Sequence, residues 1–207
     1  KHYQDFVNTM YPTLHDNKDY TSIVNDKQYN RLQGYLEDAR DQGATIIELN
    51  SKKESLTEVR KIAPTLLTGV TTEMEIMKNE IFGPILPILE YEHIEDALQF
   101  INSRPRPLAF YYFDIDMAPA DYVAGRTHSG HFGINQTLTH VAQDDLPFGG
   151  IGASGMGKYH GKEGFFSFSH ERSVMSNPVS PKLYSLKFIL PPYNKAAHKL
   201  LLKTLFR

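Results

Sequence analysis

A short acidic and aromatic motif, Glu80-Ile81-Phe82-Gly83-Pro84, combines residue types that could hold a nucleotide. In an extended segment, residues two apart point the same way, so Glu80 and Phe82 would face one partner. A carboxylate can accept hydrogen bonds from both hydroxyls of a ribose, and a phenyl ring can pack on a neighbouring heterocycle. Taken alone, the motif fits better a glutamate at the entrance of a strand beside a phenylalanine of the core.

Glycine is concentrated in a second candidate region, where seven of the fourteen glycines lie between residues 149 and 164. Residues 150–155 match the G-x-G-x-x-G pattern of dinucleotide-binding loops, and residues 152–158 resemble a phosphate-binding P-loop. The first pattern must leave a strand and open a helix, and the residues after Gly155 carry no helix signal. The second pattern requires a serine or threonine where Tyr159 stands. We therefore expect a sharply bent loop here rather than a phosphate site.

Composition limits the class of protein. The chain has 207 residues, 41% of them hydrophobic and 22% charged, which is typical of one globular domain with an appendage. A net charge of −2 gives no electrostatic basis for a nucleic-acid partner. No apolar run reaches the roughly 18–20 residues that span a bilayer, so a membrane partner is not expected either.

The absence of cysteine excludes disulfides, thiolate metal sites and a cysteine nucleophile within these residues. The nine histidines include no H-E-x-x-H run, and we expect no metal site. The first residues do not resemble a signal peptide, and the cytoplasm is the expected location.

Hydrophobic periodicity predicts an α/β fold. It indicates helices at residues 26–43, 72–79, 94–103 and 118–128, and strands at 44–49, 64–70, 84–91, 108–113 and 131–136. The first two strands should pair across a surface turn, and the later alternation predicts a parallel sheet with at least three crossover units. We expect an irregular start, a long functional loop at 137–170 and one more strand at 173–176.

The tail from Asn194 has lysines or an arginine at every fourth position: Lys195, Lys199, Lys203 and Arg207. This spacing predicts a basic amphipathic helix. Docking on its own or a neighbouring subunit is the favoured role, and a membrane-surface anchor is the alternative. The expected division is therefore a domain at residues 1–177 and an extension at 178–207.

Four motifs occur together and in order: Glu80 to Pro84, Arg106 to Tyr111, Gly133 to Asn135, and Leu146 to Gly157. In this combination they resemble the NAD(P)-dependent aldehyde dehydrogenase superfamily. Tyr159-His160-Gly161 is most similar to the class 3 branch and, within it, to coniferyl aldehyde dehydrogenases. The resemblance is firmest over residues 60–177, and it implies the C-terminal part of the catalytic domain, with oligomerisation strands and a C-terminal tail helix.

The resemblance also implies roles for single residues. Glu80 would hold the nicotinamide ribose of NAD or NADP, and the ring of Phe82 would pack near the nicotinamide. Asn135 and the residues from Thr137 to His140 would line the substrate tunnel. Phe148 would form part of the tunnel wall, and the glycines that follow it would let the loop fold close to the active site.

One departure from the family pattern concerns the reacting groups. In this family a cysteine thiolate attacks the aldehyde and a glutamate activates the water that releases the acid. The resemblance places both residues, and the dinucleotide-binding half, farther upstream of Glu80 than the 79 residues that precede it. We therefore expect no catalytic residue in this chain and no activity of the chain alone.

The resemblance implies that the chain is part of an enzyme. That enzyme would oxidise an aldehyde to a carboxylate, and the aldehyde would be aromatic and similar to coniferyl aldehyde. Its expected partners are the upstream half of the same enzyme, a second copy in a homodimer and a small-molecule aldehyde. A structural or oligomerising module without catalysis is the alternative. A phosphate-binding protein that uses the glycine loop ranks below both.

Overall fold

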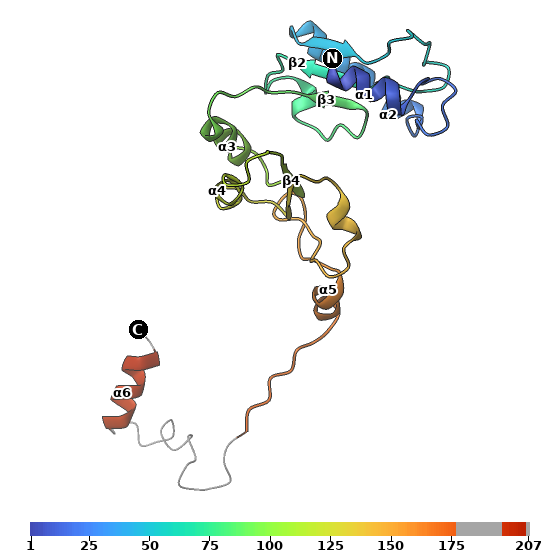
Figure 1. Ribbon diagram of the computed structural model, residues 1–207. Coiled ribbons are helices and arrows are strands. Elements are labelled where there is room, and N and C mark those ends of the chain that lie inside the picture. The colour runs from blue at the N-terminus through green and yellow to red at the C-terminus, as the bar shows by residue number, and fades with distance from the viewer. Residues whose placement is uncertain (177–195, 206–207) are drawn as a thin grey trace. The chain divides into compact units, whose positions relative to one another are not determined.

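The protein is described by a computed structural model, which covers residues 1–176 and 196–205 (Figure 1). The chain divides into two compact units, Lys1–Ala97 and Leu98–Arg207, here called unit 1 and unit 2. Helix α3 (Ile94–Asn102) crosses the boundary between them. The expected domain boundary at residues 177 and 178 lies outside the described residues and stays a prediction.

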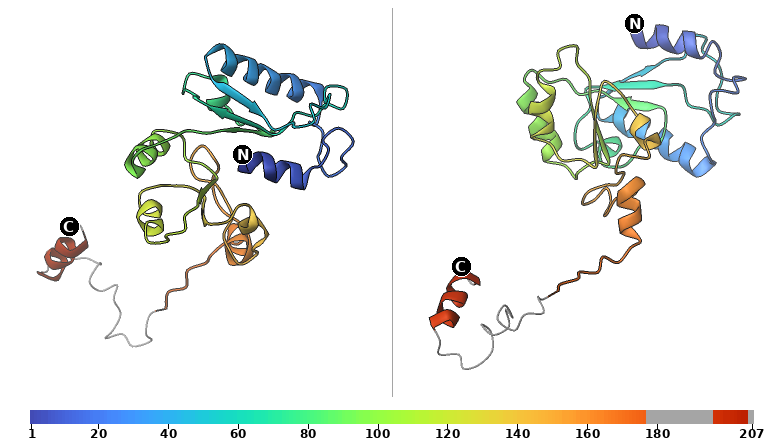
Figure 2. Two further views of the ribbon diagram at one scale, coloured as in Figure 1. Left: turned by 45° about the horizontal axis from the view of Figure 1, so that its top comes forward. Right: turned by 60° about the horizontal axis from the view of Figure 1, so that its bottom comes forward.

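Unit 1 is a three-stranded sheet with helices on both faces. The sheet holds β1 (Thr45–Glu48), β2 (Thr65–Thr68) and β3 (Ile85–Pro87), in the order β1-β2-β3. Strand β1 runs antiparallel to β2, as the sequence predicts, and β2 runs parallel to β3. In both views of Figure 2 the sheet lies between α1 (His2–Met10) and α2 (Asp26–Asp41).

Helix α2 forms where the sequence predicts it. The side chain of Asn25 caps its start by accepting a hydrogen bond of 2.9 Å from the amide of Gln28. Leu32, Leu36 and Ala39 recur at three- and four-residue steps and are all buried. After the helix, Gly43 has a φ of 90°, a conformation that glycine adopts without strain.

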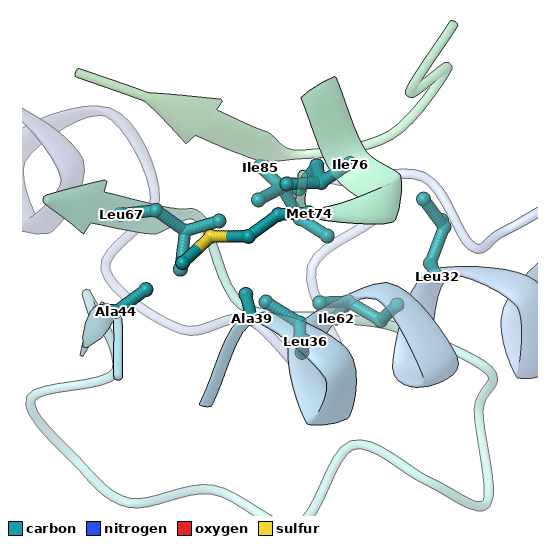
Figure 3. Packing of buried hydrophobic residues seen from close by; sticks show 9 residues of the cluster. All are labelled: Leu32, Leu36, Ala39, Ala44, Ile62, Leu67, Met74, Ile76 and Ile85. Carbon is teal, nitrogen blue, oxygen red and sulfur yellow. The ribbon is translucent and has the colours of Figure 1, made fainter. Parts of the chain in front are cut away.

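The core of unit 1 lies between α2 and the sheet (Figure 3). Alternate residues of β2 face the helix, so Thr65 and Leu67 are buried while Leu66 and Thr68 are half-exposed. The other members come from η1, from β3 and from the residues just before β1, β2 and η1: Ala44, Ile62, Met74, Ile76 and Ile85. This packing fixes the segment between η1 (Glu75–Met77) and β3, which carries Glu80 and Phe82.

A buried cation organises the loop that precedes α2. The ammonium of Lys61, 6% exposed, donates hydrogen bonds to the backbone oxygens of Leu14, His15 and Asn17 at 2.8, 2.7 and 2.8 Å. The carboxylate of Glu54 accepts from the amides of Leu14 and His15. These bonds satisfy polar groups that would otherwise be costly to bury.

Unit 2 contains one parallel strand pair. Strands β4 (Ala109–Tyr112) and β5 (His131–Ile134) are parallel, and the connection between them contains α4 (Ala120–Ala124). This is the strand-helix-strand order of a crossover unit. Helix α4 is much shorter than the predicted helix 118–128, because Pro119 precedes its first turn and Gly125 follows its last. Beyond β5 lie η2 (Thr139–Ala142), α5 (Gly161–Ser167) and α6 (Ala196–Leu205).

Several expectations about single elements were wrong. Residues 2–10 are helical rather than irregular, a helix without a side-chain N-cap and with Val7 as its one buried residue. The predicted helix at 72–79 is a 3₁₀ turn of three residues. Residues 173–176 form no strand, and the described residues contain two parallel strand pairs, β2 with β3 and β4 with β5, rather than three crossovers in one sheet.

The tail helix was predicted correctly for the part that the structure describes. Lys199 and Lys203 are exposed on α6, whereas Asn194, Lys195 and Arg207 lie outside the described residues. Within residues 1–176 and 196–205, no helix combines the length and the apolar character needed to cross a membrane.

Candidate functional site

The loop that carries Glu80 is held on α2 by one guanidinium. Arg31 donates from Nη1 to the backbone oxygen of Glu80 at 3.0 Å and from Nη2 to that of Ile81 at 2.7 Å. Its own orientation is set by Gln28, whose Oε1 accepts from Nε at 2.6 Å, and by Tyr35, whose hydroxyl lies 3.0 Å from Nη1. Because these bonds use only the backbone of Glu80, its exposed carboxylate remains available to a partner.

Phe82 points away from the protein. Its side chain is 82% exposed and its φ of 49° lies in the left-handed region, which is uncommon for an aromatic residue. The core alternative for this phenylalanine was therefore wrong. The motif is not extended either, since β3 begins only at Ile85, so the two-residue spacing does not place Glu80 and Phe82 on one strand face.

Gly83 lets the same loop approach α2 closely. A Cβ atom at this position would lie 2.6 Å from Cδ1 and 2.9 Å from Cδ2 of Leu32, which is fully buried. Next to it a hollow of about 330 Å³ is lined by Phe82, Gly83, Pro84 and the segment 20–24. The sequence singled out neither this segment nor Arg31, and the only signal that could have found Arg31 is its position on the α2 face that bears Gln28 and Tyr35.

In unit 2, Asn135 follows β5 and braces the loop after β4. Its Nδ2 donates to the backbone oxygen of Asp114 at 2.8 Å, and its Oδ1 accepts from the amide of Asp114 at 3.0 Å. The residue has a φ of 50°, which asparagine tolerates better than most residues. The carboxyl ends of parallel strands are where α/β folds bind ligands, and an open hollow lies here beside Asn135, Phe113 and Met117.

Thr137 lies in an exposed turn between β5 and η2. Its backbone oxygen accepts from the amide of Thr139 at 2.7 Å, and the hydroxyl of Thr139 is hydrogen-bonded to the side chain of Gln136. Leu138 has a φ of 62° and is 70% exposed, and its amide donates to the hydroxyl of Tyr111 at 3.3 Å. The turn thus presents its side chains to the exterior while β4 holds its backbone.

His140 lies in the interior rather than on an open surface. It is 4% exposed, and its ring stacks on that of His131 with a centroid distance of 3.6 Å and an interplanar angle of 6°. Neither ring nitrogen of His140 has a hydrogen-bond partner among the described residues. Burial, and secondarily the charge of His140, lower the pKa of His131 below its usual value.

Phe148 belongs to the same cluster. Its backbone forms an antiparallel bridge with Tyr159, through hydrogen bonds of 2.9 and 2.8 Å in the two directions. Its ring centroid lies 5.7 Å from that of His140 and 5.8 Å from that of His160. The structure thus brings two of the predicted pocket residues together, whereas Asn135 and Thr137 lie on the exposed turn that leads to them.

The glycine loop that follows Phe148 is a tight double bend. Gly152 and Gly155 form an antiparallel bridge, and the next helix begins only at Gly161, so no helix N-terminus faces the apparent G-x-G-x-x-G. A Cβ at Gly149 would lie 2.1 Å from the backbone oxygen of Gly157, and one at Gly150 would lie 2.1 Å from that of Ser154. The prediction of a sharply bent loop is confirmed.

Comparison with known proteins decides the family. The sequence model of the aldehyde dehydrogenase family matches residues 4–174. The chain belongs to the aldehyde dehydrogenase family. The resemblance noted on the four motifs and the assignment to the α/β fold of this family are both confirmed.

Two relatives are coniferyl aldehyde dehydrogenases. The probable coniferyl aldehyde dehydrogenase of Pseudomonas aeruginosa is 48% identical over 205 residues, which are 99% of this chain and 42% of the relative. The coniferyl aldehyde dehydrogenase of Pseudomonas sp. strain HR199 is 46% identical over 95% of this chain and 41% of its own length. The aldehyde dehydrogenase chain therefore spans about two fifths of the relatives that it matches.

Solved structures of aldehyde dehydrogenases are similar to this chain. The substrate-bound AldH of Staphylococcus aureus is 37% identical, with a TM-score of 0.74, over 98% of this chain and 42% of that chain. Betaine aldehyde dehydrogenase of Staphylococcus aureus, in complex with NAD⁺, is 28% identical with a TM-score of 0.63, over 71% of this chain and 29% of that one.

Proposed function

We propose that this chain is the C-terminal part of the catalytic domain of an NAD(P)-dependent aldehyde dehydrogenase that oxidises an aromatic, coniferyl-like aldehyde to a carboxylate. The observation that carries the proposal is the loop of Glu80 and Phe82, held on α2 by Arg31 with its carboxylate and ring exposed. The coniferyl and probable coniferyl aldehyde dehydrogenases among its relatives support the substrate class.

The residues at this loop fit one end of a nicotinamide nucleotide. An exposed carboxylate suits the paired hydroxyls of a ribose, and an exposed phenyl ring suits the flat face of a heterocycle. When bound, the nicotinamide supplies the acceptor for the two electrons that the aldehyde loses. Glu80 would hold the ribose and Phe82 would limit the position of the ring, while Arg31 keeps their backbone fixed.

The candidate pocket residues of unit 2 would select the aldehyde by the shape of the tunnel that they line. Asn135, Thr137, His140 and Phe148 come from the turn and the aromatic cluster beyond the carboxyl end of β5. The rings of His140 and Phe148 would give the tunnel wall rigidity, because each is held by further aromatic contacts. An apolar wall favours an aromatic aldehyde and excludes water from it.

The nucleophile is proposed to lie in the upstream half, because these 207 residues contain no cysteine. That half is the proposed partner of the chain, and it would also supply the base and the pyrophosphate site. A homodimer and a cytoplasmic location stay predictions.

A chimera tests the proposal. The matching segment of the Pseudomonas aeruginosa relative would be replaced by this chain, and NADH or NADPH formation would be followed with coniferyl aldehyde. We expect turnover by the chimera and none by the chain alone. Glu80→Gln in the chimera should raise the KM for the nucleotide about tenfold, through loss of charge-assisted hydrogen bonds.

The matched control is Glu58→Gln, which changes an exposed glutamate of the same unit. A folded chimera that binds the nucleotide yet oxidises no aldehyde would favour the alternative, a structural or oligomerising module. Turnover by the isolated chain would overturn the placement of the nucleophile upstream.

A further inference from the structure

A hollow of about 300 Å³ in unit 2 is lined by three arginines and a histidine. The cationic residues are Arg104 and Arg106, which lie between α3 and β4, and Arg126 and His128, which lie between α4 and β5. No aspartate or glutamate lines this hollow, so its walls carry a formal charge of +3 with the histidine neutral. In a chain with a net charge of −2, that local excess is not a consequence of composition.

Two of the guanidinium groups are held in place by aromatic rings. The Cζ atom of Arg104 lies 4.4 Å from the ring centroid of Phe100, and that of Arg126 lies 3.7 Å from the ring centroid of Tyr122. Stacking fixes the plane of each group, so less side-chain entropy is lost when a ligand binds. Nδ2 of Asn102 also donates to the backbone oxygen of Arg126 at 2.8 Å, which ties the end of α3 to the loop after α4.

Helix ends account for only part of this charge. Arg104 and Arg126 lie just beyond the last turns of α3 and α4, where cations are stabilised by the helix dipoles. Arg106 lies farther along the chain and is exposed, and its guanidinium has no hydrogen bond or ion pair with any residue that the structure describes. Neither a helix end nor an acidic neighbour therefore explains its presence beside the other two.

We propose that this basic hollow binds the phosphate group of a small molecule, either inorganic phosphate or a phosphate monoester. A guanidinium presents two parallel N–H donors that match two phosphate oxygens, and three such groups complement a doubly charged anion. The volume admits a phosphate with a small substituent. This inference concerns residues that the proposed aldehyde site does not use.

Titration calorimetry of the 207-residue chain with inorganic phosphate tests the inference, with a sugar phosphate and the unphosphorylated sugar as further probes. We expect saturable binding of phosphate and of the sugar phosphate, and none of the sugar. Tighter binding of the sugar phosphate would identify a monoester as the ligand, and tighter binding of phosphate would identify the free ion. Arg106→Gln should weaken binding about tenfold, and Arg106→Lys should weaken it less, because the charge remains while the fork is lost.

Arg40→Gln is the matched control, since Arg40 is an exposed arginine on α2 in the other unit. Thermal unfolding without phosphate should be the same for Arg106→Gln and the parent chain, which separates lost binding from lost folding. Equal weakening of phosphate binding by Arg106→Gln and Arg40→Gln would overturn the site. So would loss of phosphate binding in sodium chloride to the same extent in the parent chain and in Arg106→Gln at one ionic strength. Absence of saturation by either phosphate compound would overturn it as well.

Discussion

The imidazole of His140 lies flat on that of His131, with 3.6 Å between the ring centroids and 6° between the planes. The groups that face this pair are the phenol of Tyr111 on β4 and the ring of Phe148, neither of which carries negative charge. The side-chain amide of Gln136 approaches Nε2 of His131 at 3.4 Å. The stack joins η2 to β5, and protonation of His131 would place a charge in this partly buried contact.

Unit 2 should lose stability when the pH falls below the usual histidine range. The pKa of His131 is lowered in the folded state, first by burial and then by His140, so the unfolded chain binds its proton at a higher pH. Stability is therefore fully present above about pH 6.5 and is lost as the pH falls toward the lowered folded-state pKa. Thermal unfolding between pH 7.5 and 5 should show a falling midpoint in this window.

His131→Phe should reduce that acid sensitivity, because it keeps an aromatic ring against His140 and removes the group whose pKa is shifted. His93→Gln is the control, since His93 is exposed. An unchanged pH dependence in His131→Phe would show that the stacked pair does not control the acid loss.

Arg31 should position the loop of Glu80 and Phe82 rather than contact a ligand. In Arg31→Lys a single ammonium replaces the fork that donates to the backbone oxygens of Glu80 and Ile81. We expect a loss of about 1 kcal/mol in the free energy of unfolding, measured with urea. In the chimera with the Pseudomonas aeruginosa relative, the KM for NAD⁺ should rise more than kcat falls. Arg40→Lys, on the same helix and exposed, should change neither value, and equal effects of the two variants would contradict the positioning role.

The sequence was sufficient to predict those helices and strands whose hydrophobic pattern is local. Apolar residues at three- and four-residue steps predicted a helix at 26–43, and α2 forms at Asp26–Asp41. The strand predicted at 64–70 forms as β2 over Thr65–Thr68. Helix α1 was missed although Tyr3, Phe6, Val7 and Met10 recur at three- and four-residue steps, a helical pattern of which only Val7 is buried. Residues 84–91 read as a long buried strand, yet only three pair, since pairing depends on a neighbour strand that the local sequence does not specify.

The motif named residues of the candidate site, but it did not predict their backbone conformation or their contacts. The motif placed Glu80 and Phe82 at one site, yet an extended motif was expected and a left-handed Phe82 was found. The roles of Arg31 and His131 depend on contacts across 50 and 9 residues of sequence, to Ile81 and His140, which no spacing rule reveals. Asn135 was predicted to line a tunnel, and its amide is already occupied by the backbone of Asp114.

Two glycines of unit 1 offer a matched test of the packing that fixes the loop of Glu80 and Phe82. At Gly83 a Cβ would lie 2.6 Å from a methyl group of Leu32 on α2, whose side chain is fully buried. At Gly34, an exposed position inside α2, a Cβ would meet nothing within 4 Å.

Gly83→Ala should therefore destabilise the chain by about 1–3 kcal/mol, the usual cost of overpacking a core contact. Gly34→Ala should stabilise it by about 0.5–1 kcal/mol, because alanine restricts the unfolded chain and favours the helix. Urea unfolding of the two variants measures both signs in one experiment. If both substitutions were stabilising, Leu32 would be free to yield, and the close approach of the loop to α2 could not be what holds Phe82 in its exposed, left-handed conformation.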